Sequence, residues 1–401
     1  MDLRSSYPFW LLNNGIIATY PSLSKNSRTQ VAILGAGITG ALVAWHLCKK
    51  GFDVIIVDKR HVGMGSTAAS TALLQYEIDT PLHKLAEIVG ERNAARSYKL
   101  CINSIYEIEK ICKELKTDVG FSLKESFQYA STKKDSRDLE KEFAIRKKHG
   151  IDLKWLTEKD IKTKFGFYAP AGLLSSEGAQ IDAYRFTHAI LAHIAATGRL
   201  QVFDATEVLD IKHHRNTVTL STSLGTTITA NHLVIASGYE SQKYLPKKVE
   251  EFHSTYAIVS EPFSENKFWY HNSLIWETAT PYLYLRTTDD NRILIGGKDD
   301  EFSSAFKRDS ALPGKAKALE KSFNKLFPNI PFKTDFQWAG TFAITKDGLP
   351  FIGSVRQRPA TSFALGFGGN GITFSVIAAQ MIRDKLMGKV NKDELIFSFN
   401  R

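Results

Sequence analysis

The chain has 401 residues, of which 43% are apolar and 23% are charged. This balance supports a large buried core and excludes a disordered, collagen-like or disulfide-stapled chain. The 52 lysines and arginines outnumber the 42 aspartates and glutamates, so the formal net charge is +10 and an anionic partner has to be considered. At roughly 150 residues per domain, the length predicts two or three domains, or two domains whose segments interleave.

No run of residues approaches the ~20 uninterrupted apolar positions that a membrane-spanning helix needs. The apolar cluster from Phe9 to Leu12 is interrupted at once by the polar residues 13–15, so it does not resemble the core of a signal peptide. We therefore expect a cytoplasmic protein without a membrane span.

Cysteine and histidine positions predict no metal site. The three cysteines, Cys48, Cys101 and Cys112, are too scattered for a disulfide framework or a zinc site. The neighbouring His213 and His214 would point to opposite faces of a strand, so they would not share a metal ion.

The first predicted elements form a strand, a glycine turn, a helix and a second strand. Residues 31–34 are a short apolar run typical of a buried strand, and they lead directly into the sequence from Gly35 to Gly40. A helical pattern follows over residues 38–50, and residues 54–57 predict the second strand, which ends at Asp58. This order is typical of a dinucleotide-binding unit, and it is more specific than the glycine pattern alone.

Each residue type in this unit has a physical role in binding a dinucleotide. Gly35 permits a tight turn, Gly37 lets the backbone approach a pyrophosphate, and Gly40 lets the helix pack closely on the strand. The first helical residues, Ile38 and Thr39, lie where backbone N–H groups attract a phosphate. The acid at position 58 follows Gly40 at a spacing that suits hydrogen bonds to a ribose diol.

A second cofactor segment is expected over residues 63–72. It is rich in small and hydroxyl residues, and it could lie against a second phosphate and a flat ring. The candidate contacts are Ser66, Thr67, Ser70 and Thr71. An ordinary helix start rich in small residues is the alternative interpretation.

Further elements are predicted in the middle of the chain. Asp182 is expected to cap a helix that runs to about Thr197 and ends at Gly198, and residues 202–229 indicate a meander of strands. Alternating strands are expected over residues 252–259 and 282–286.

The last elements decide between cofactors. Residues 362–367 predict a strand, and a glycine turn leads from it into a helix that ends near Met387. The positive end of such a helix would favour the anionic charge of a reduced flavin, for which nicotinamide has no equivalent need. The candidate contacts here are Gly369, Asn370, Gly371, Ile372 and Thr373.

With these motifs, the chain resembles the FAD-dependent oxidoreductases of the D-amino-acid oxidase superfamily, which includes glycine oxidase and sarcosine oxidase. The resemblance spans nearly the whole chain and also rests on the segments 207–208, 232–238, 338–340 and 347–353. It implies FAD as the cofactor and adds candidate contacts at Lys59, Val208, Ala236, Gly238 and Gly340.

The resemblance also implies the fold class and the domains. We expect an α/β fold in which a Rossmann-like FAD-binding domain is interleaved with an α+β substrate-binding domain built on an antiparallel sheet. Residues 1–27 would be an N-terminal arm. The FAD-binding domain would comprise residues 28–80, 178–238 and 335–401, and the substrate domain would comprise residues 81–177 and 239–334.

Residues 65–85 and 20–23 look most like a branch of the superfamily in which the flavoprotein is fused to a C-terminal Rieske iron-sulfur domain. This sequence lacks the cysteine and histidine pairs that such a cluster requires, so we expect no electron transfer to an attached cluster.

For the substrate, the resemblance implies a small amine or amino acid. A hydride would move from the carbon beside nitrogen to flavin N5, and oxygen or another acceptor would reoxidise the flavin. Glycine oxidase and its relatives carry an arginine, which binds the substrate carboxylate, at the position of Phe342. Arg286 is the candidate replacement, because it should share a strand face with Tyr284. Tyr256 is a candidate pocket aromatic; for all three, a structural role in the core is the alternative.

Two other functions stay open. One is an FAD-dependent enzyme that acts on a modified base of transfer RNA, which the net charge of +10 would suit. The other is a non-catalytic flavoprotein that serves as a redox sensor. A nicotinamide-dependent dehydrogenase ranks last, because it leaves the glycine turn at residues 368–371 unexplained.

Overall fold

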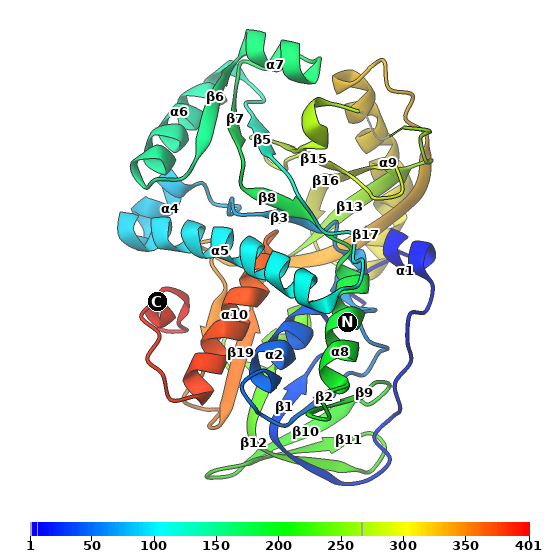
Figure 1. Ribbon diagram of the computed structural model, residues 1–401, viewed down its shortest axis with the longest axis vertical. Coiled ribbons are helices and arrows are strands. Elements are labelled where there is room, and N and C mark those ends of the chain that lie inside the picture. Colours follow the sequence, from blue (N-terminus) through cyan, green and yellow to red (C-terminus); the bar gives the residue numbers. More distant parts are fainter. Residues whose placement is uncertain (1, 6, 266–267) are drawn as a thin grey trace.

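The computed structural model describes residues 2–5, 7–265 and 268–401. Within these ranges the strands form two eight-stranded sheets and one three-stranded sheet. Figure 1 places the first large sheet in the lower half of the molecule and the second in the upper half, with the long helix α5 (Glu91–Leu115) running across the middle. This arrangement agrees with the predicted pair of interleaved α/β and antiparallel regions.

The first sheet has the order β10-β11-β12-β1-β2-β9, with β19 beside β12 and β18 beside β19. β12, β1, β2 and β9 run parallel, as does β19 beside β12, whereas β10, β11 and β12 form the predicted antiparallel meander. The continuous apolar sequences of β1 and β2 suit strands that are covered on both faces. The bounds are β1 Ser27–Leu34, β2 Val54–Val57, β9 Leu200–Phe203, β10 Val208–His213, β11 Val218–Thr222, β12 Thr227–Ile235, β18 Phe351–Gly353 and β19 Thr361–Leu365.

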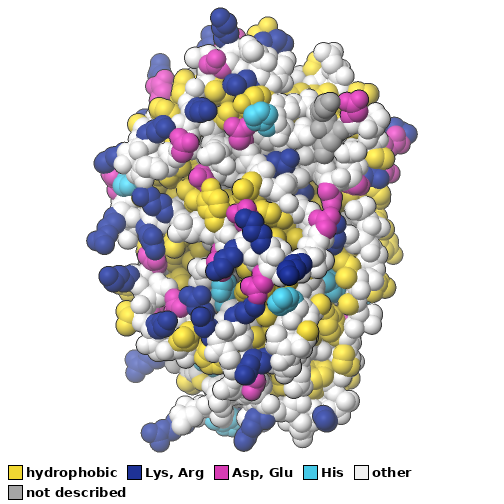
Figure 2. Space-filling view, in the orientation of Figure 1, with side chains coloured by type: hydrophobic (Ala, Val, Ile, Leu, Met, Phe, Trp, Pro, Cys, Tyr) yellow, Lys and Arg dark blue, Asp and Glu magenta, His cyan; other side chains and the backbone are white. Residues whose placement is uncertain are grey.

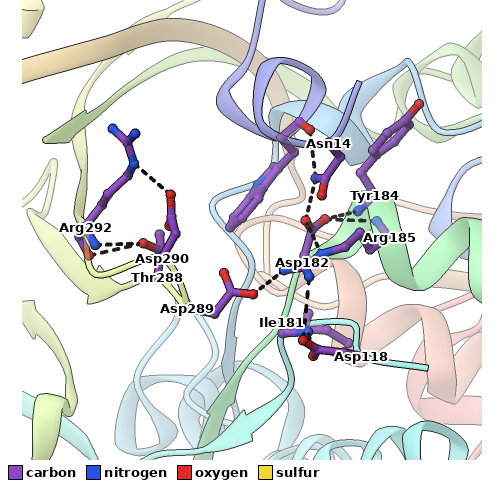
Figure 3. A network of polar contacts seen from close by, with 12 residues as sticks. Asn14, Asp118, Ile181, Asp182, Tyr184, Arg185, Thr288, Asp289, Asp290 and Arg292 are labelled. Atoms are coloured by element: carbon purple, nitrogen blue, oxygen red, sulfur yellow. Dashed lines mark hydrogen bonds and ion pairs between the residues drawn. The ribbon is translucent and has the colours of Figure 1, made fainter. Parts of the chain in front are cut away.

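Three helices pack side by side on this sheet (Figure 1): α2 (Ile38–Cys48), α8 (Ala183–Ala195) and α10 (Gly371–Leu386). The predicted cap of α8 is confirmed. Asp182 Oδ1 accepts hydrogen bonds from the backbone N–H groups of Tyr184 and Arg185, and Asn14 of the N-terminal arm donates to Asp182 Oδ2 (Figure 3). The cap therefore also ties the arm to the first sheet's helical layer.

The second sheet has the order β17-β13-β16-β15-β14-β5-β7-β6 and is antiparallel except where β14 meets β5. Helix α9 (Ala305–Leu326) packs on β13, β16 and β17, and α6 (Lys133–Lys148) and α7 (Glu158–Phe165) pack on β6 and β7. The strand bounds are β5 Ser126–Tyr129, β6 Leu153–Thr157, β7 Ala171–Ser175, β13 Glu251–Ser260, β14 Leu274–Glu277, β15 Tyr284–Thr287, β16 Ile293–Glu301 and β17 Thr334–Ile344.

One predicted boundary differs from the observed pairing. The segment 335–401 was expected to belong to the FAD-binding region, but β17 lies in the second sheet. It pairs with β13 along its whole length, from Thr334 opposite Ser260 to Ile344 opposite Glu251. Backbone hydrogen bonds between segments so far apart in the sequence leave no local pattern, so the sequence could not indicate them.

The remaining elements connect the two large sheets. β3 (Leu73–Gln75), β8 (Gly178–Gln180) and β4 (Ser122–Leu123) form the small sheet. The short helices are α1 Phe9–Asn14, α3 Ser66–Ala69 and α4 Leu82–Val89, with 3-10 turns at Gly238–Tyr244, Tyr270–Asn272 and Glu394–Phe397. In α1 the apolar cluster seen in the sequence serves the core, because Phe9 and Trp10 are fully buried.

Among the described helices, none is long and apolar enough to cross a membrane. On the face drawn in Figure 2, lysine and arginine side chains are spread from end to end with aspartates and glutamates among them. On this face, basic and acidic side chains are intermixed.

Candidate cofactor cleft and substrate cavity

The strand, glycine turn and helix predicted at the start of the chain are observed. Gly35 has a φ of +114°, and a Cβ atom there would lie 2.4 Å from the carbonyl oxygen of Ala236. At Gly40 a Cβ atom would lie 1.9 Å from the carbonyl oxygen of Gly35. Only glycine fits at either position, so these residues fix the turn and the close packing of α2 on β1.

Gly37 is the N-cap of α2 and supplies no side-chain cap. A Cβ atom on it would lie 2.9 Å from Thr67 Oγ1, and that hydroxyl accepts a hydrogen bond from Ile38 N–H. Thr67 thereby ties α3 to the helix start. Apart from Ile38 N–H, which Thr67 accepts, the start of α2 has no side-chain cap from Gly37, and it presents the positive end of the helix dipole to the cleft, which is the chemistry that a phosphate requires.

The acid after β2 has partners that the sequence did not reveal. Asp58 Oδ2 accepts a hydrogen bond from Ala36 N–H at 2.8 Å, and its Oδ1 accepts one from Arg60 N–H at 2.8 Å. Beside it, Lys59 and Arg60 both form ion pairs with Glu240. Burial opposes ionisation of Glu240, but the hydrogen bonds from Arg60 and Lys59 lower its pKa to about 2. The lysine at this position is therefore held in an ion pair at the rim of the cleft.

These residues line a cleft of about 1140 Å³. Fourteen predicted cofactor contacts lie on its wall: Gly35, Gly37, Ile38, Thr39, Asp58, Lys59, Ser66, Thr67, Ser70, Val208, Ala236, Gly238, Gly371 and Ile372. Among these residues, Gly35, Asp58 and Ala236 directly follow the carboxyl ends of β1, β2 and β12. Ligands of parallel sheets bind at this edge.

The segment 66–72 is fixed by two buried tryptophans. Trp10 Nε1–H donates to the carbonyl of Ser70 at 2.7 Å, and Trp338 Nε1–H donates to the carbonyl of Ala69 at 2.9 Å. These bonds hold Ser66 and Ser70 on the wall of the cleft. The predicted small-residue segment is thus placed by contacts from the arm and from β17.

Near the C-terminal end of the chain, Asn370 holds the glycine turn before α10. Its Nδ2 donates to the carbonyls of Gln75 and Glu77, and the Thr373 hydroxyl donates to the carbonyl of Asn370. Gly369 N–H donates to Asp79 Oδ2 at 2.8 Å. Asn370 and Thr373, both predicted as contacts, are outside the residues that line either cavity, and they position the helix start instead.

A second cavity of about 920 Å³ adjoins the cleft, and its wall includes three further predicted contacts, Thr71, Gly340 and Gly369. The two cavities share the lining residues Ser66, Ser70, Tyr239, Gly371 and Ile372. We call this second space the inner cavity. Its aromatic wall is formed by Tyr239, Tyr256, Tyr282, Tyr284, Trp338 and Phe342.

The structure brings the predicted Tyr256 and Tyr284 together in this wall. Tyr284 pairs with Gly296 across β15 and β16, and a Cβ atom on Gly296 would overlap the tyrosine ring, so glycine leaves room for it. The hydroxyl of Tyr256 donates to Asp300 Oδ2 at 3.3 Å. Both tyrosines therefore face the cavity from fixed positions on the second sheet.

Comparison with known proteins decides the family. The model of the DAO family, FAD dependent oxidoreductase, matches residues 30–385. The chain belongs to this family. The glycine oxidase of Geobacillus kaustophilus is 26% identical over 396 residues, which cover 93% of this chain and 97% of that enzyme. The crystal structure of glycine oxidase from this organism has a TM-score of 0.79 at 22% identity and covers 94% of this chain and 99% of that chain.

Two other relatives widen the comparison. A putative Rieske 2Fe-2S iron-sulfur protein of Bacillus subtilis is 24% identical, over 96% of this chain and 74% of that protein. The gamma-glutamylputrescine oxidoreductase of Escherichia coli is 24% identical, over 94% of this chain and 87% of that enzyme. The predicted family, fold class, FAD cofactor and oxidoreductase activity are thus confirmed.

In this DAO family protein, one predicted substrate residue is buried among backbone carbonyls. Arg286 is 1% exposed, and its Nη1 donates to the carbonyls of Thr71, Ala72 and Ile181, while its Nε donates to the carbonyl of Thr287. It is not among the residues that line the inner cavity. These contacts favour the alternative of a structural role for Arg286, because backbone carbonyls accept the hydrogen bonds of its Nη1 and Nε.

Several lining residues were missed by the sequence analysis. In the cleft they include Leu3, Gly63, Ser237, Lys243, Tyr244 and Gly366, and in the inner cavity they include Gln75, Thr255, Asp299 and Thr341. Gly63 and Ser237 lie in segments that the sequence analysis had already connected with the cofactor, whereas most of the others lie in segments without a motif, where the sequence carried no signal. No group of three or more metal-binding side chains occurs in the ranges that the structure describes.

Proposed function

We propose that this DAO family protein oxidises the C–N bond of a small amine or amino acid, with transfer of a hydride from the carbon beside nitrogen to FAD. The observation that carries the proposal is the inner cavity, which adjoins the cofactor cleft through shared lining residues and has an aromatic wall. Glycine oxidase and gamma-glutamylputrescine oxidoreductase, as named relatives, support the substrate class.

The cleft residues would hold the cofactor. The N-terminus of α2 at Gly37 would bind the pyrophosphate, and the carboxylate of Asp58 would accept from the ribose while it holds the turn. The N-terminus of α10, fixed by Asn370, would lie beside the ring system. FAD, when bound, supplies the hydride acceptor.

The residues that line the inner cavity would orient the substrate and exclude water. Tyr256 and Trp338 are each 1% exposed, so the aromatic wall is fixed by packing. Desolvation in such a cavity favours the neutral form of an amine, which is the form that gives up a hydride. A cytoplasmic location and the choice between oxygen and another electron acceptor stay predictions.

The test is an anaerobic reduction experiment on the purified, FAD-loaded protein. A panel of amines and of D- and L-amino acids is added one by one, and the visible flavin bands are recorded. We expect one class of compound to bleach the bands. A protein that binds no FAD, or flavin that no amine or amino acid bleaches, would overturn the proposal.

The reduction experiment, together with a transfer-RNA binding assay, distinguishes the other two functions. Salt-sensitive retention of transfer RNA, together with flavin that small amines do not reduce, would favour a macromolecular substrate. Flavin that is photoreduced but never reduced by any compound of the panel would favour the redox sensor.

A further inference from the structure

The inner cavity contains a carboxylate but no cationic side chain. Of its lining residues within the described ranges, Asp299 is the sole carboxylate, and none is a lysine, arginine or histidine. A substrate carboxylate placed there would lack a cationic partner and would be repelled by Asp299, which makes its burial costly. The wall chemistry therefore disfavours an α-amino acid whose carboxylate lies inside.

Asp299 itself is incompletely satisfied. It lies near the end of β16, and its Oδ1 is buried without a hydrogen-bond partner in the described part of the chain. Burial raises the pKa of Asp299 to about 6, opposed by a hydrogen bond from Thr255 and supported by the nearby charge of Asp79. At neutral pH the cavity therefore presents an ionised oxygen that lacks a partner.

Two cationic side chains near this region, Lys315 and Arg308, have hydrogen-bond partners outside the cavity. Lys315 donates to Asp300 Oδ1 and to the carbonyl of Lys298. Arg308 lies behind Thr341 and donates to the Thr341 hydroxyl, to Asp309 and to the carbonyl of Asp2. Neither residue lines the cavity, although the nearby charge of Lys315 lowers the pKa of Asp299.

A second acid strengthens the negative character of this region. Asp79 Oδ1 accepts a hydrogen bond from the Tyr282 hydroxyl at 3.0 Å, and its Oδ2 accepts one from Gly369 N–H. Tyr282 and Tyr284 lie with ring centroids 5.8 Å apart, and Trp276 packs edge-on against Tyr282. Aromatic faces beside carboxylates attract a cation both by the ring quadrupole and by charge.

We propose that the inner cavity selects a diamine: one nitrogen undergoes oxidation as the neutral amine, and a second, protonated nitrogen pairs with Asp299 beside the tyrosines. This inference rests on the proposed function and narrows its substrate class. The nitrogen bound to Asp299 is distinct from the one oxidised, because an ammonium held by a carboxylate cannot give up a hydride from its carbon until it loses its proton.

The test compares three matched series of linear compounds from propyl to octyl: diamines, monoamines, and amino acids with a terminal carboxylate. They differ in the charge at the end remote from the oxidised nitrogen. We expect kcat/KM for flavin reduction in the FAD-loaded protein to rank the diamine first and the amino acid last at the preferred chain length. The substitution Asp299→Asn should reduce kcat/KM for the diamine by roughly 10- to 100-fold and leave the monoamine within about twofold.

Glu301→Gln is the matched control, because Glu301 lies on the same strand, is exposed, and loses the same charge. It should leave the ranking unchanged. Flavin content and Tm of both variants show whether they fold. Preference for the amino acid, or an equal loss for diamine and monoamine in Asp299→Asn, would overturn this inference. Flavin that no compound of any kind reduces would instead overturn the proposed function.

Discussion

Gly37 shows how a single missing side chain governs cofactor binding. It is the N-cap residue of α2, and a Cβ atom would come within 2.9 Å of Thr67 Oγ1. The branched side chain of Gly37→Val would both displace Thr67 and fill the approach to the helix N-terminus. We expect this variant to retain less than about a tenth of the wild-type FAD, measured as the ratio of flavin to protein absorbance.

Gly314→Val is the control for this variant. Gly314 lies in α9, and a Cβ atom on it would have no neighbouring atom within 4 Å, so the same substitution should leave FAD content unchanged. Full FAD content in Gly37→Val would contradict the assignment of the cleft.

Glu250 is a buried acid whose charge has no counterpart. It is 1% exposed, neither carboxyl oxygen makes a hydrogen bond of good geometry within the described structure, and burial raises its pKa to about 8. The folded protein therefore keeps a proton on Glu250 that the unfolded chain releases above the ordinary glutamate pKa of 4.5. The stability from this site is full below that value and is lost as the pH rises towards 8.

Glu250→Gln removes this loss of stability at high pH, because the amide stays neutral at every pH. We expect the variant to match the wild type at about pH 4 and to exceed it by roughly 1–3 kcal/mol at about pH 8.5 in free energy of unfolding. Denaturant titrations at the two pH values measure the difference. A difference that is the same at both pH values would show that Glu250 does not titrate in this way.

At the scale of elements, the N-terminal arm completes the cleft. Thr341 N–H donates to the carbonyl of Leu3, and Ser5 N–H donates to the carbonyl of Ala339, so residues 3–5 extend the second sheet at the edge of β17. This pairing places the Leu3 side chain, 5% exposed, on the wall of the cofactor cleft. The arm is thus an integral part of the site.

The substitution Leu3→Ala should weaken FAD binding about 10-fold, because part of an apolar contact worth roughly 1.5–3 kcal/mol is lost. Titration of the FAD-free protein with FAD measures the Kd. Leu12→Ala, on the same arm but at a side chain that is 50% exposed, is the control and should leave Kd unchanged. An unchanged Kd in Leu3→Ala would show that the leucine does not contact the cofactor.

At the scale of the whole molecule, Arg286 joins regions that are far apart in the sequence. From β15 of the second sheet it donates to the carbonyls of Thr71 and Ala72, in the segment before β3, and of Ile181, just before α8. Next to it, Arg185 of α8 forms ion pairs with Asp182 and with Asp289 of the β15–β16 turn (Figure 3). Together these contacts fix the second sheet to the cofactor region.

We therefore expect Arg286→Met to destabilise the protein by about 3–5 kcal/mol, because several buried carbonyls lose their donor. The loss should appear as a lower Tm of the FAD-loaded protein. Arg215→Met, which removes an exposed arginine from the β10–β11 hairpin, should leave Tm unchanged. A selective rise of KM for acidic substrates with unchanged Tm would restore Arg286 as a substrate residue.

The cofactor-binding end of this protein could be predicted from its amino-acid sequence. The strand, the turn from Gly35 to Gly40, the helix and Asp58 interact within about thirty residues, so local periodicity and glycine chemistry are enough to predict them. The glycine turn before α10 was found for the same reason, since a strand, a turn and a helix follow one another directly.

The substrate side, in contrast, depends on contacts between segments that are distant in the sequence. Leu3 reaches the cleft through β17, Arg286 binds backbone more than two hundred residues away, and Asp299 enters the cavity only because β16 lies between β13 and β15. Such positions depend on strand order and on pairing between distant segments, which leave no local pattern in the sequence. The chemistry of the substrate cavity is therefore a property of the fold.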